Sequence, residues 1–139
     1  MVIYAPADWE VRANCALKNA TLTPETATEF CLSEATSSAL AASFNGSEYK
    51  VHEFAESVPL STYLYCFVAG PYDVFTPKTE DPDLAVPLGL LCRKSMSKYT
   101  EVAAEDWFRV TRAGIKYYEK MFQCPYPFDK LDQILCPDF

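Results

Sequence analysis

The spacing of apolar residues changes along the chain and divides it into two parts. Up to about residue 94, apolar and polar positions tend to alternate, which is typical of strands. From residue 100 onwards, apolar residues recur every three, four or seven positions, which is typical of a helix. This switch of period predicts a domain boundary, with a first domain over 1–94 and a second over 95–139. The predicted class is therefore α+β.

The first part contains most of the predicted strands. Tyr4 to Asn14 reads as one strand-like segment, with a turn at Ala5 to Asp8 near its start. Tyr49 to Phe54 alternates and follows the turn signal Asn45-Gly46. LSTYLYCFVAG, residues 60–70, is the strongest strand prediction, because bulky and mostly apolar side chains occupy both of its faces.

The second part contains the predicted helix, with one predicted strand before it, Val86 to Cys92, and one after it, Leu131 to Cys136. Thr100 is the predicted N-cap. Cys124-Pro125 stops the helix, because proline disfavours helical geometry in the residue before it. Glu105 and Arg109 are spaced for an ion pair on its charged face. The apolar face is formed by Ala104, Phe108, Ile115, Tyr118 and Phe122.

The charge and hydropathy of the chain exclude several partners. The net charge is −7, and no basic run is longer than Arg93-Lys94, so we expect neither nucleic acid nor an anionic membrane as a partner. No apolar stretch approaches the ~18 residues that a membrane span needs. The N-terminal residues lack the basic start and long apolar stretch of a secretory signal, so a cytoplasmic location is expected.

The six cysteines allow two interpretations. They lie at least twelve residues apart, so the chain has no CxxC pair and no zinc-ribbon spacing. Six reduced thiols are the interpretation that a chain without a signal favours. The alternative is an extracellular disulfide framework, which two sequons at Asn19 and Asn45 would suit. The positions are 15, 31, 66, 92, 124 and 136.

Catalytic motifs are not visible in the sequence. His52 is the single histidine, and its place in an alternating segment predicts a partly exposed strand residue. A catalytic zinc site usually needs several histidines, so none is predicted within these residues. A Ser-His-Asp or Cys-His centre is not predicted either. The four glycines form neither GxGxxG nor a P-loop.

The acidic residues have structural interpretations. Glu80, Asp81 and Asp83 in the loop before the helix are expected to be solvated, although a carboxylate pair can act as general acid and base. Asp132 lies within an apolar strand that Asp129 and Asp138 flank. A buried carboxylate needs a partner, so Asp132 is expected to fix local structure.

Aromatic residues gather near the end of the predicted helix. They are either part of a ligand cleft or core residues, and the helical spacing favours the core. The residues are Tyr117, Tyr118, Phe122, Tyr126 and Phe128.

Several blocks of sequence resemble aminopeptidase N-like zinc metallopeptidases (gluzincin aminopeptidases). FAESVPLSTYLYCFVAGPYDVF (54–75) resembles the end of that family's first domain, and VPLGLLCRKS (86–95) resembles the strand that leaves it. VTRAGIKYYEKMFQCPYPFDKLDQILCPDF (110–139) resembles the first helix and strand of the catalytic domain. APADWEVRAN (5–14) also fits a strand of the first domain.

The resemblance implies a fold and a function. Residues 1–94 would be the C-terminal part of a β-rich saddle domain, and residues 95–139 the start of a thermolysin-like peptidase domain. The full-length enzyme would use zinc to remove N-terminal residues from peptide substrates. Its amine-binding GAMEN loop and HExxH zinc motif would follow the last strand.

The same resemblance assigns no site residue here. None of the family's catalytic, substrate-binding or metal-binding residues can be carried over to a position of this chain. This chain alone is therefore expected to bind no zinc, to be inactive, and to act as a structural part of the enzyme. The alternatives are a non-catalytic β-rich binding module or a gene relic, and a secreted domain held by disulfides.

Overall fold

The computed structural model describes residues 1–22, 39, 42–45, 47–79, 81–84 and 86–136. The chain forms two compact units, Met1–Gly70 and Pro71–Phe139. The first unit is rich in β-strands, and the second combines a mixed sheet with a long helix. The predicted α+β class is confirmed.

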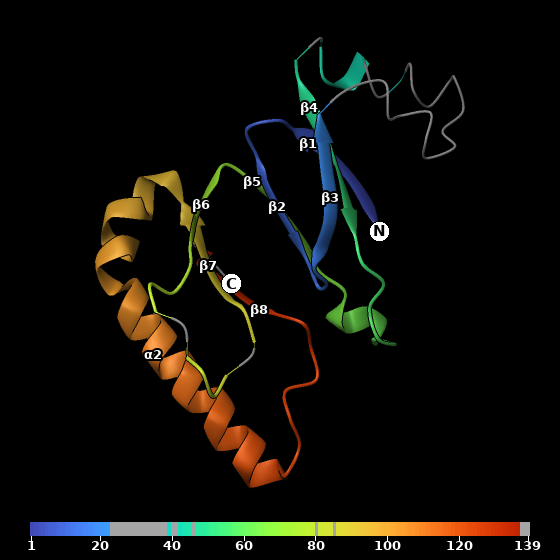
Figure 1. Ribbon diagram of the computed structural model, residues 1–139. Helices are drawn as coiled ribbons and strands as arrows, with labels where there is room; N and C mark the ends of the chain where they lie inside the picture. The colour runs from blue at the N-terminus through green and yellow to red at the C-terminus, as the bar shows by residue number, and fades with distance from the viewer. Residues whose placement is uncertain (23–38, 40–41, 46, 80, 85, 137–139) are drawn as a thin grey trace. The chain divides into compact units, whose positions relative to one another are not determined.

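Unit 1 contains two small antiparallel sheets. In one, β4 (Tyr49–Phe54) lies between β1 (Val2–Pro6) and β3 (Leu17–Leu22). In the other, β2 (Glu10–Ala13) pairs with β5 (Phe67–Gly70). Figure 1 shows both sheets of this unit. Their shared core consists of Ala5, Val11, Ala13 and Phe54, with Ile3 and Ala69 at its margin.

The predicted strand at residues 60–70 is wrong over its first half. Only Phe67–Gly70 is a strand, while Thr62–Leu64 is a 3₁₀ turn with Tyr63 92% exposed. The Asn14 side chain explains this, because its Nδ2 donates to the Leu64 carbonyl at 2.9 Å and its Oδ1 accepts from the Cys66 N–H at 2.8 Å. A side chain thus pairs backbone groups that a neighbouring strand would otherwise have to pair.

The predicted single segment from Tyr4 to Asn14 is also wrong, because a turn divides it. The Trp9 N–H donates to the Pro6 carbonyl at 3.0 Å, and the chain passes from β1 into β2. The two strands then belong to different sheets. The predicted turn therefore interrupts the segment near its middle. In contrast, the strand predicted at Tyr49 to Phe54 is confirmed with the same bounds.

Unit 2 is built around a strand–helix–strand crossover (Figure 1). Its central strand β7 (Leu88–Arg93) runs antiparallel to β6 (Tyr72–Phe75) and parallel to β8 (Leu131–Ile134). A short 3₁₀ turn, Lys94–Met96, leads from β7 into helix α2 (Ser97–Phe122). Parallel neighbours need such a crossover, and α2 provides it.

Helix α2 starts earlier than the sequence predicted and ends where predicted. Thr100 is not its N-cap, because the Thr100 hydroxyl donates to the Met96 carbonyl at 3.1 Å inside the first turn. At the other end, Gln123 adopts a left-handed conformation with φ 53°. The Cys124 N–H then donates to the Glu119 carbonyl at 3.2 Å and closes the helix.

The core of unit 2 lies between α2 and the sheet. It consists of Leu88, Leu90, Ala104, Phe108 and Ile115. The interpretation of Phe108 and Ile115 as core residues is confirmed, but Phe122 is 66% exposed in this chain. The boundary expected after residue 94 falls inside unit 2, directly after β7. The family-level division into 1–94 and 95–139 stays a prediction.

We predict that Ile115→Ala lowers the free energy of unfolding of unit 2 by about 2–5 kcal/mol, because it leaves a cavity in a closely packed core. Urea unfolding followed by the helical circular-dichroism signal measures the change. Val102→Ala is the matched control on the same helix, since Val102 is 87% exposed. Its effect should stay within about 0.5 kcal/mol. Equal losses for the two variants would contradict the placement of this core.

Candidate functional site

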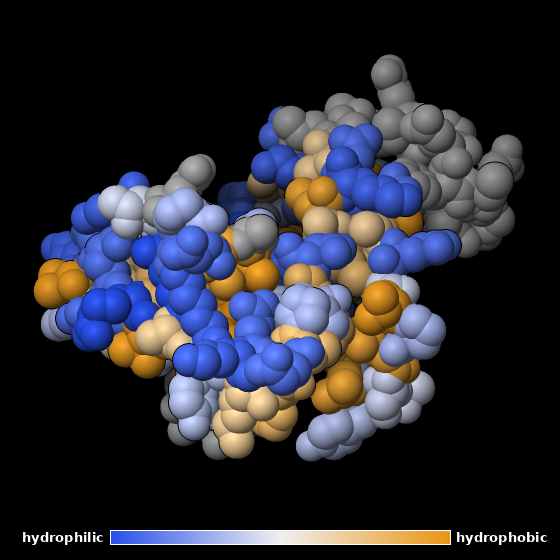
Figure 2. Space-filling model, turned by 60° about the horizontal axis from the view of Figure 1, so that its bottom comes forward, coloured by the Kyte–Doolittle hydropathy of each residue, from blue (hydrophilic) through white to orange (hydrophobic). Residues whose placement is uncertain are grey.

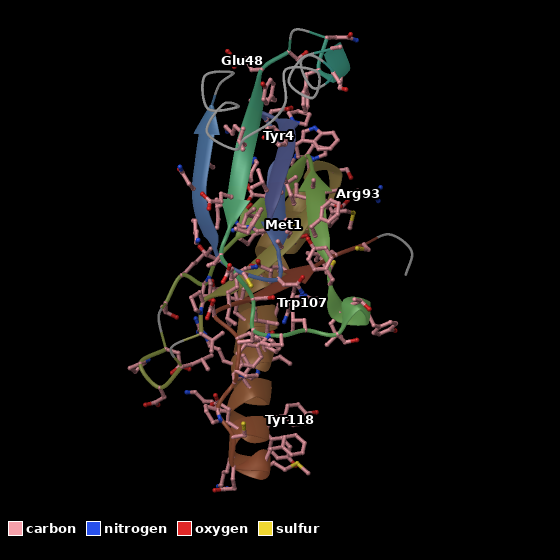
Figure 3. The ribbon with its side chains drawn as sticks, turned by 90° about the vertical axis from the view of Figure 1, so that its right-hand side faces the viewer. Met1, Tyr4, Glu48, Arg93, Trp107 and Tyr118 are labelled. Carbon is pink, nitrogen blue, oxygen red and sulfur yellow. The ribbon has the colours of Figure 1, made fainter. Side chains whose placement is uncertain are left out.

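An apolar groove of about 490 Å³ lies in unit 2 at the C-terminal half of α2. The helix forms one wall, the loop after it forms the end, and β8 forms the other wall. Tyr118 projects from the side of the helix here (Figure 3). The groove is lined by Thr111, Gly114, Ile115, Tyr118, Glu119, Phe122, Cys124, Pro125, Tyr126, Pro127, Leu131 and Gln133.

Three hydrogen bonds hold the walls of the groove together. The Tyr126 N–H donates to Glu119 Oε1 at 2.7 Å, which ties the loop back to the helix. Gln133 Nε2 donates to Thr111 Oγ1 at 2.7 Å, which ties β8 to the helix. The Tyr126 hydroxyl donates to the Lys130 carbonyl at 3.4 Å. The polar atoms of the walls are thus largely paired with one another, and the remaining surface is apolar.

The aromatic residues of this region form two pairs. Tyr118 and Phe122 are stacked with ring centroids 5.8 Å apart, and Tyr126 and Phe128 meet edge to face at 5.6 Å. Tyr117, Tyr118 and Phe122 are all more than half exposed. The interpretation of these three residues as core residues is therefore wrong within this chain, and the alternative of a cleft fits their geometry. For Tyr126 the core interpretation is confirmed, because it packs against the core of unit 2.

The groove is better suited to binding an apolar surface than to a reaction. Among its described lining residues, Cys124 offers a thiol and Glu119 a carboxylate, but no histidine is present. The Cys124 sulfur faces the Pro125 carbonyl, and Glu119 already accepts from Tyr126. Burial, and secondarily the charge of Asp132, raise the pKa of Tyr126, so its hydroxyl remains a donor at neutral pH.

Asp132 has a charged partner, as the sequence predicted for a buried carboxylate. Its carboxylate and the Lys130 ammonium group form an ion pair, and both side chains are more than four-fifths buried. Asp132 lies opposite Gly89 in the parallel register of β7 and β8. A Cβ atom at position 89 would overlap Asp132 Oδ1. Glycine is therefore needed where the carboxylate lies against the neighbouring strand.

The loop acids are not uniformly solvated as predicted. Asp81 accepts from Lys116 Nζ at 2.8 Å. This hydrogen bond is the main cause that lowers the pKa of Asp81 and raises the pKa of Lys116. Asp83 and Asp129 are exposed, whereas Glu80 and Asp138 lie outside the described residues.

The predicted Glu105–Arg109 pair is replaced by other contacts. Glu105 Oε1 accepts from the Lys78 N–H at 3.0 Å, so it ties the helix to the preceding loop. Arg109 instead pairs with Asp106 at 3.2 Å, one residue further along the helix. Both groups of this pair are solvent-exposed, so the pair contributes little to stability.

His52 in unit 1 is buried, and the prediction of a partly exposed residue is wrong. Its exposed fraction is 5%, and it lies between Ile3 of β1 and Ala20 of β3. Within the described part of the chain, neither ring nitrogen has a hydrogen-bond partner. Burial is the main cause that lowers the pKa of His52; Lys50 lowers it further, and Glu10 opposes this.

The other candidate chemistries find little support in the described part of the chain. No cluster of three or more potential metal ligands occurs there. Its five cysteines, 15, 66, 92, 124 and 136, are free thiols, and Cys31 lies outside the described residues. None of the helices described combines the length and apolarity needed to cross a bilayer.

Comparisons with known proteins identify relatives. No profile of a known protein family matches the chain. Aminopeptidase N of Streptomyces lividans is 35% identical over 89 residues, which is 64% of this chain and 10% of that protein. Glutamyl aminopeptidase of Mus musculus is 33% identical over 91 residues, 66% of this chain and 9% of that protein.

A third relative is the tricorn protease-interacting factor F2 of Thermoplasma acidophilum. It is 31% identical over 93 residues, which is 67% of this chain and 11% of that protein. The chain therefore spans about a tenth of the length of the curated relatives it matches.

We predict that Gly89→Ala destabilises unit 2 by about 1–3 kcal/mol, because the new methyl group overlaps Asp132. Adding Asp132→Ala removes the overlap, so the double variant should lose at least about 0.5 kcal/mol less than the sum of the single losses. Urea unfolding in dilute solution measures all three variants. Gly114→Ala is the matched control, since a Cβ there meets nothing within 4 Å. Strictly additive losses would contradict the proposed contact.

We predict that unit 1 loses stability as the pH falls from about 7.5 to about 5.5. The folded-state pKa of His52 lies below its unfolded value, so the unfolded chain binds the proton first. The stability is complete above the unfolded pKa and decreases below it, by at most about 1.4 kcal/mol per pH unit for one proton.

Urea unfolding followed by Trp9 fluorescence, in a Trp107→Phe background, measures this pH dependence. His52→Leu cannot take up the proton, so its stability should change less over the same range. If the two proteins showed the same pH dependence, His52 would not be the group responsible.

Proposed function

This chain is homologous to part of the aminopeptidase N-like peptidases, and from that premise we propose that it is a structural part of a zinc-dependent aminopeptidase. The complete enzyme would remove N-terminal residues from peptides. The observation that carries this proposal is the identity of 31–35% to aminopeptidases and a related factor from distant organisms.

The fold supports an assignment of the two parts of the chain. The β-rich unit 1 is compatible with the C-terminal part of a saddle domain. The crossover of β7, α2 and β8 is compatible with the start of a thermolysin-like domain. In this assignment the chain supplies packing and a rigid wall, while residues elsewhere in the enzyme carry out the reaction.

The described residues do not suit a zinc ion. Zinc in enzymes is usually held by three protein ligands with nitrogen, oxygen or sulfur donors. His52 is buried between Ile3 and Ala20, and no cluster of three potential ligands occurs among the described residues. The metal of the proposed enzyme would therefore be bound by other parts of the protein.

We predict that the intact product of the gene, expressed with all of its coding sequence, releases the N-terminal residue from aminoacyl-anilide substrates. A strong chelator should abolish the release, and added zinc should restore it, because the metal activates the attacking water in such enzymes. The 139-residue chain, tested in parallel, should show neither hydrolysis nor a stoichiometric metal ion by elemental analysis.

Two results would contradict the proposal in different ways. Zinc bound tightly by the 139-residue chain would show that a metal site has been missed within these residues. An intact gene product that is folded but inert with every peptide substrate and metal would favour the non-catalytic β-rich module or the gene relic instead.

A further inference from the structure

Helix α2 carries a second apolar face besides the one that packs on the sheet. The residues of this second face are separated by four, three, four, three and four positions in turn. This is the heptad spacing of helices that pair along a seam. Figure 2 shows apolar patches among the charged ones on the side of the molecule where α2 lies. We call this face the α2 seam: Ala103, Trp107, Val110, Gly114, Tyr117 and Met121.

The α2 seam is separate from the core of unit 2. The core face of the helix consists of Thr100, Ala104, Phe108 and Ile115, which are all buried. The large seam residues Trp107, Val110, Tyr117 and Met121 have exposed fractions of 43%, 61%, 63% and 60%. A surface helix usually has one apolar stripe, so a second stripe indicates a contact with another surface.

When two copies of α2 run antiparallel, the side chains of their seams are complementary in size. In an antiparallel pair centred between Val110 and Gly114, each Val110 side chain faces the small Gly114 of the other copy. A Cβ atom at Gly114 would meet nothing within 4 Å, so this position is open to receive it. Ala103 faces Met121 in the same way, and Trp107 faces Tyr117. The Val110–Gly114 and Ala103–Met121 pairs thus each match a larger side chain with a smaller residue, as close interdigitation requires, while Trp107 and Tyr117 form an aromatic pair.

The charges along α2 favour the same arrangement. Its first half, residues 97–109, has three acidic and two basic residues, whereas its second half, residues 110–122, has three basic residues and one glutamate. Antiparallel pairing places the acidic half of each copy against the basic half of the other.

We propose that two copies of this chain associate through the α2 seam, as an antiparallel helix pair with twofold symmetry. Such an interface uses the same patch on both copies, so its self-complementarity follows from one sequence. At the flank of the seam, Asp106 of one copy lies near Lys120 of the other, and the symmetry repeats this pair.

Sedimentation velocity of the 139-residue chain over a wide range of concentrations tests the proposal. We expect a reversible monomer–dimer equilibrium. Val110→Glu places a charge in the centre of the seam and should weaken the dimer at least about tenfold, since burying an unpaired charge is costly. Val102→Glu is the matched control, because Val102 is exposed on the same helix but outside the seam. Helical circular dichroism verifies that both variants are folded.

The direction of pairing is tested by reversing charges. Asp106→Lys and Lys120→Glu should each weaken the dimer, and the double variant should recover most of the loss, because the ion pair is restored with its signs exchanged. A protein that is monomeric at every concentration would overturn the proposal. So would a dimer that Val110→Glu leaves intact, or a double variant as weak as the single ones.

An intact gene product that is longer and monomeric would also overturn the proposal. In that case a segment of the same polypeptide, rather than a second copy, would cover the α2 seam.

Discussion

The burial of β7 is the constraint on which the rest of unit 2 depends. Leu90, Leu91 and Cys92 have no measurable solvent exposure, so this strand has protein on both faces. Every backbone group of such a strand needs a partner, and β6 and β8 supply them on its two edges. Because β8 runs parallel to β7, the chain must cross over between them, and α2 both makes that connection and covers one face of the sheet.

The position of β8 is set by polar contacts within that apolar frame. The charge of Asp132 is matched by Lys130, and Asp132 lies against Gly89, so a shift of one residue would place this side chain opposite Leu88 or Leu90 in place of the glycine. Gln133 then binds Thr111 on the helix. The same strand contributes Leu131 and Gln133 to the groove. The register of this parallel strand pair therefore fixes one wall of the groove, and the loop at residues 124–127 closes its end.

The elements that the sequence predicted well are those that periodicity alone determines. The alternation at Tyr49 to Phe54 identified β4, and helical spacing located α2 to within three residues of its start. The prediction failed at residues 60–66, where apolar side chains suggested a buried strand. A hydrogen-bonding side chain fifty residues earlier, Asn14, holds that segment as a turn. The prediction that His52 is partly exposed failed for a similar reason. Its burial depends on β1 and β3, which pair with β4 on its two edges.

The groove and the α2 seam both follow from the composition of one helix. Periodicity predicted an apolar face for α2, and Ala104, Phe108 and Ile115 fill it, but the helix has more aromatic residues than that face can bury. The surplus lies on adjacent faces, where it lines the groove and forms the α2 seam. The chain is homologous to part of the aminopeptidases, and no cluster of three or more potential metal ligands occurs among the described residues. The groove is therefore where this chain would join the rest of a working assembly, while the α2 seam would pair with a second copy.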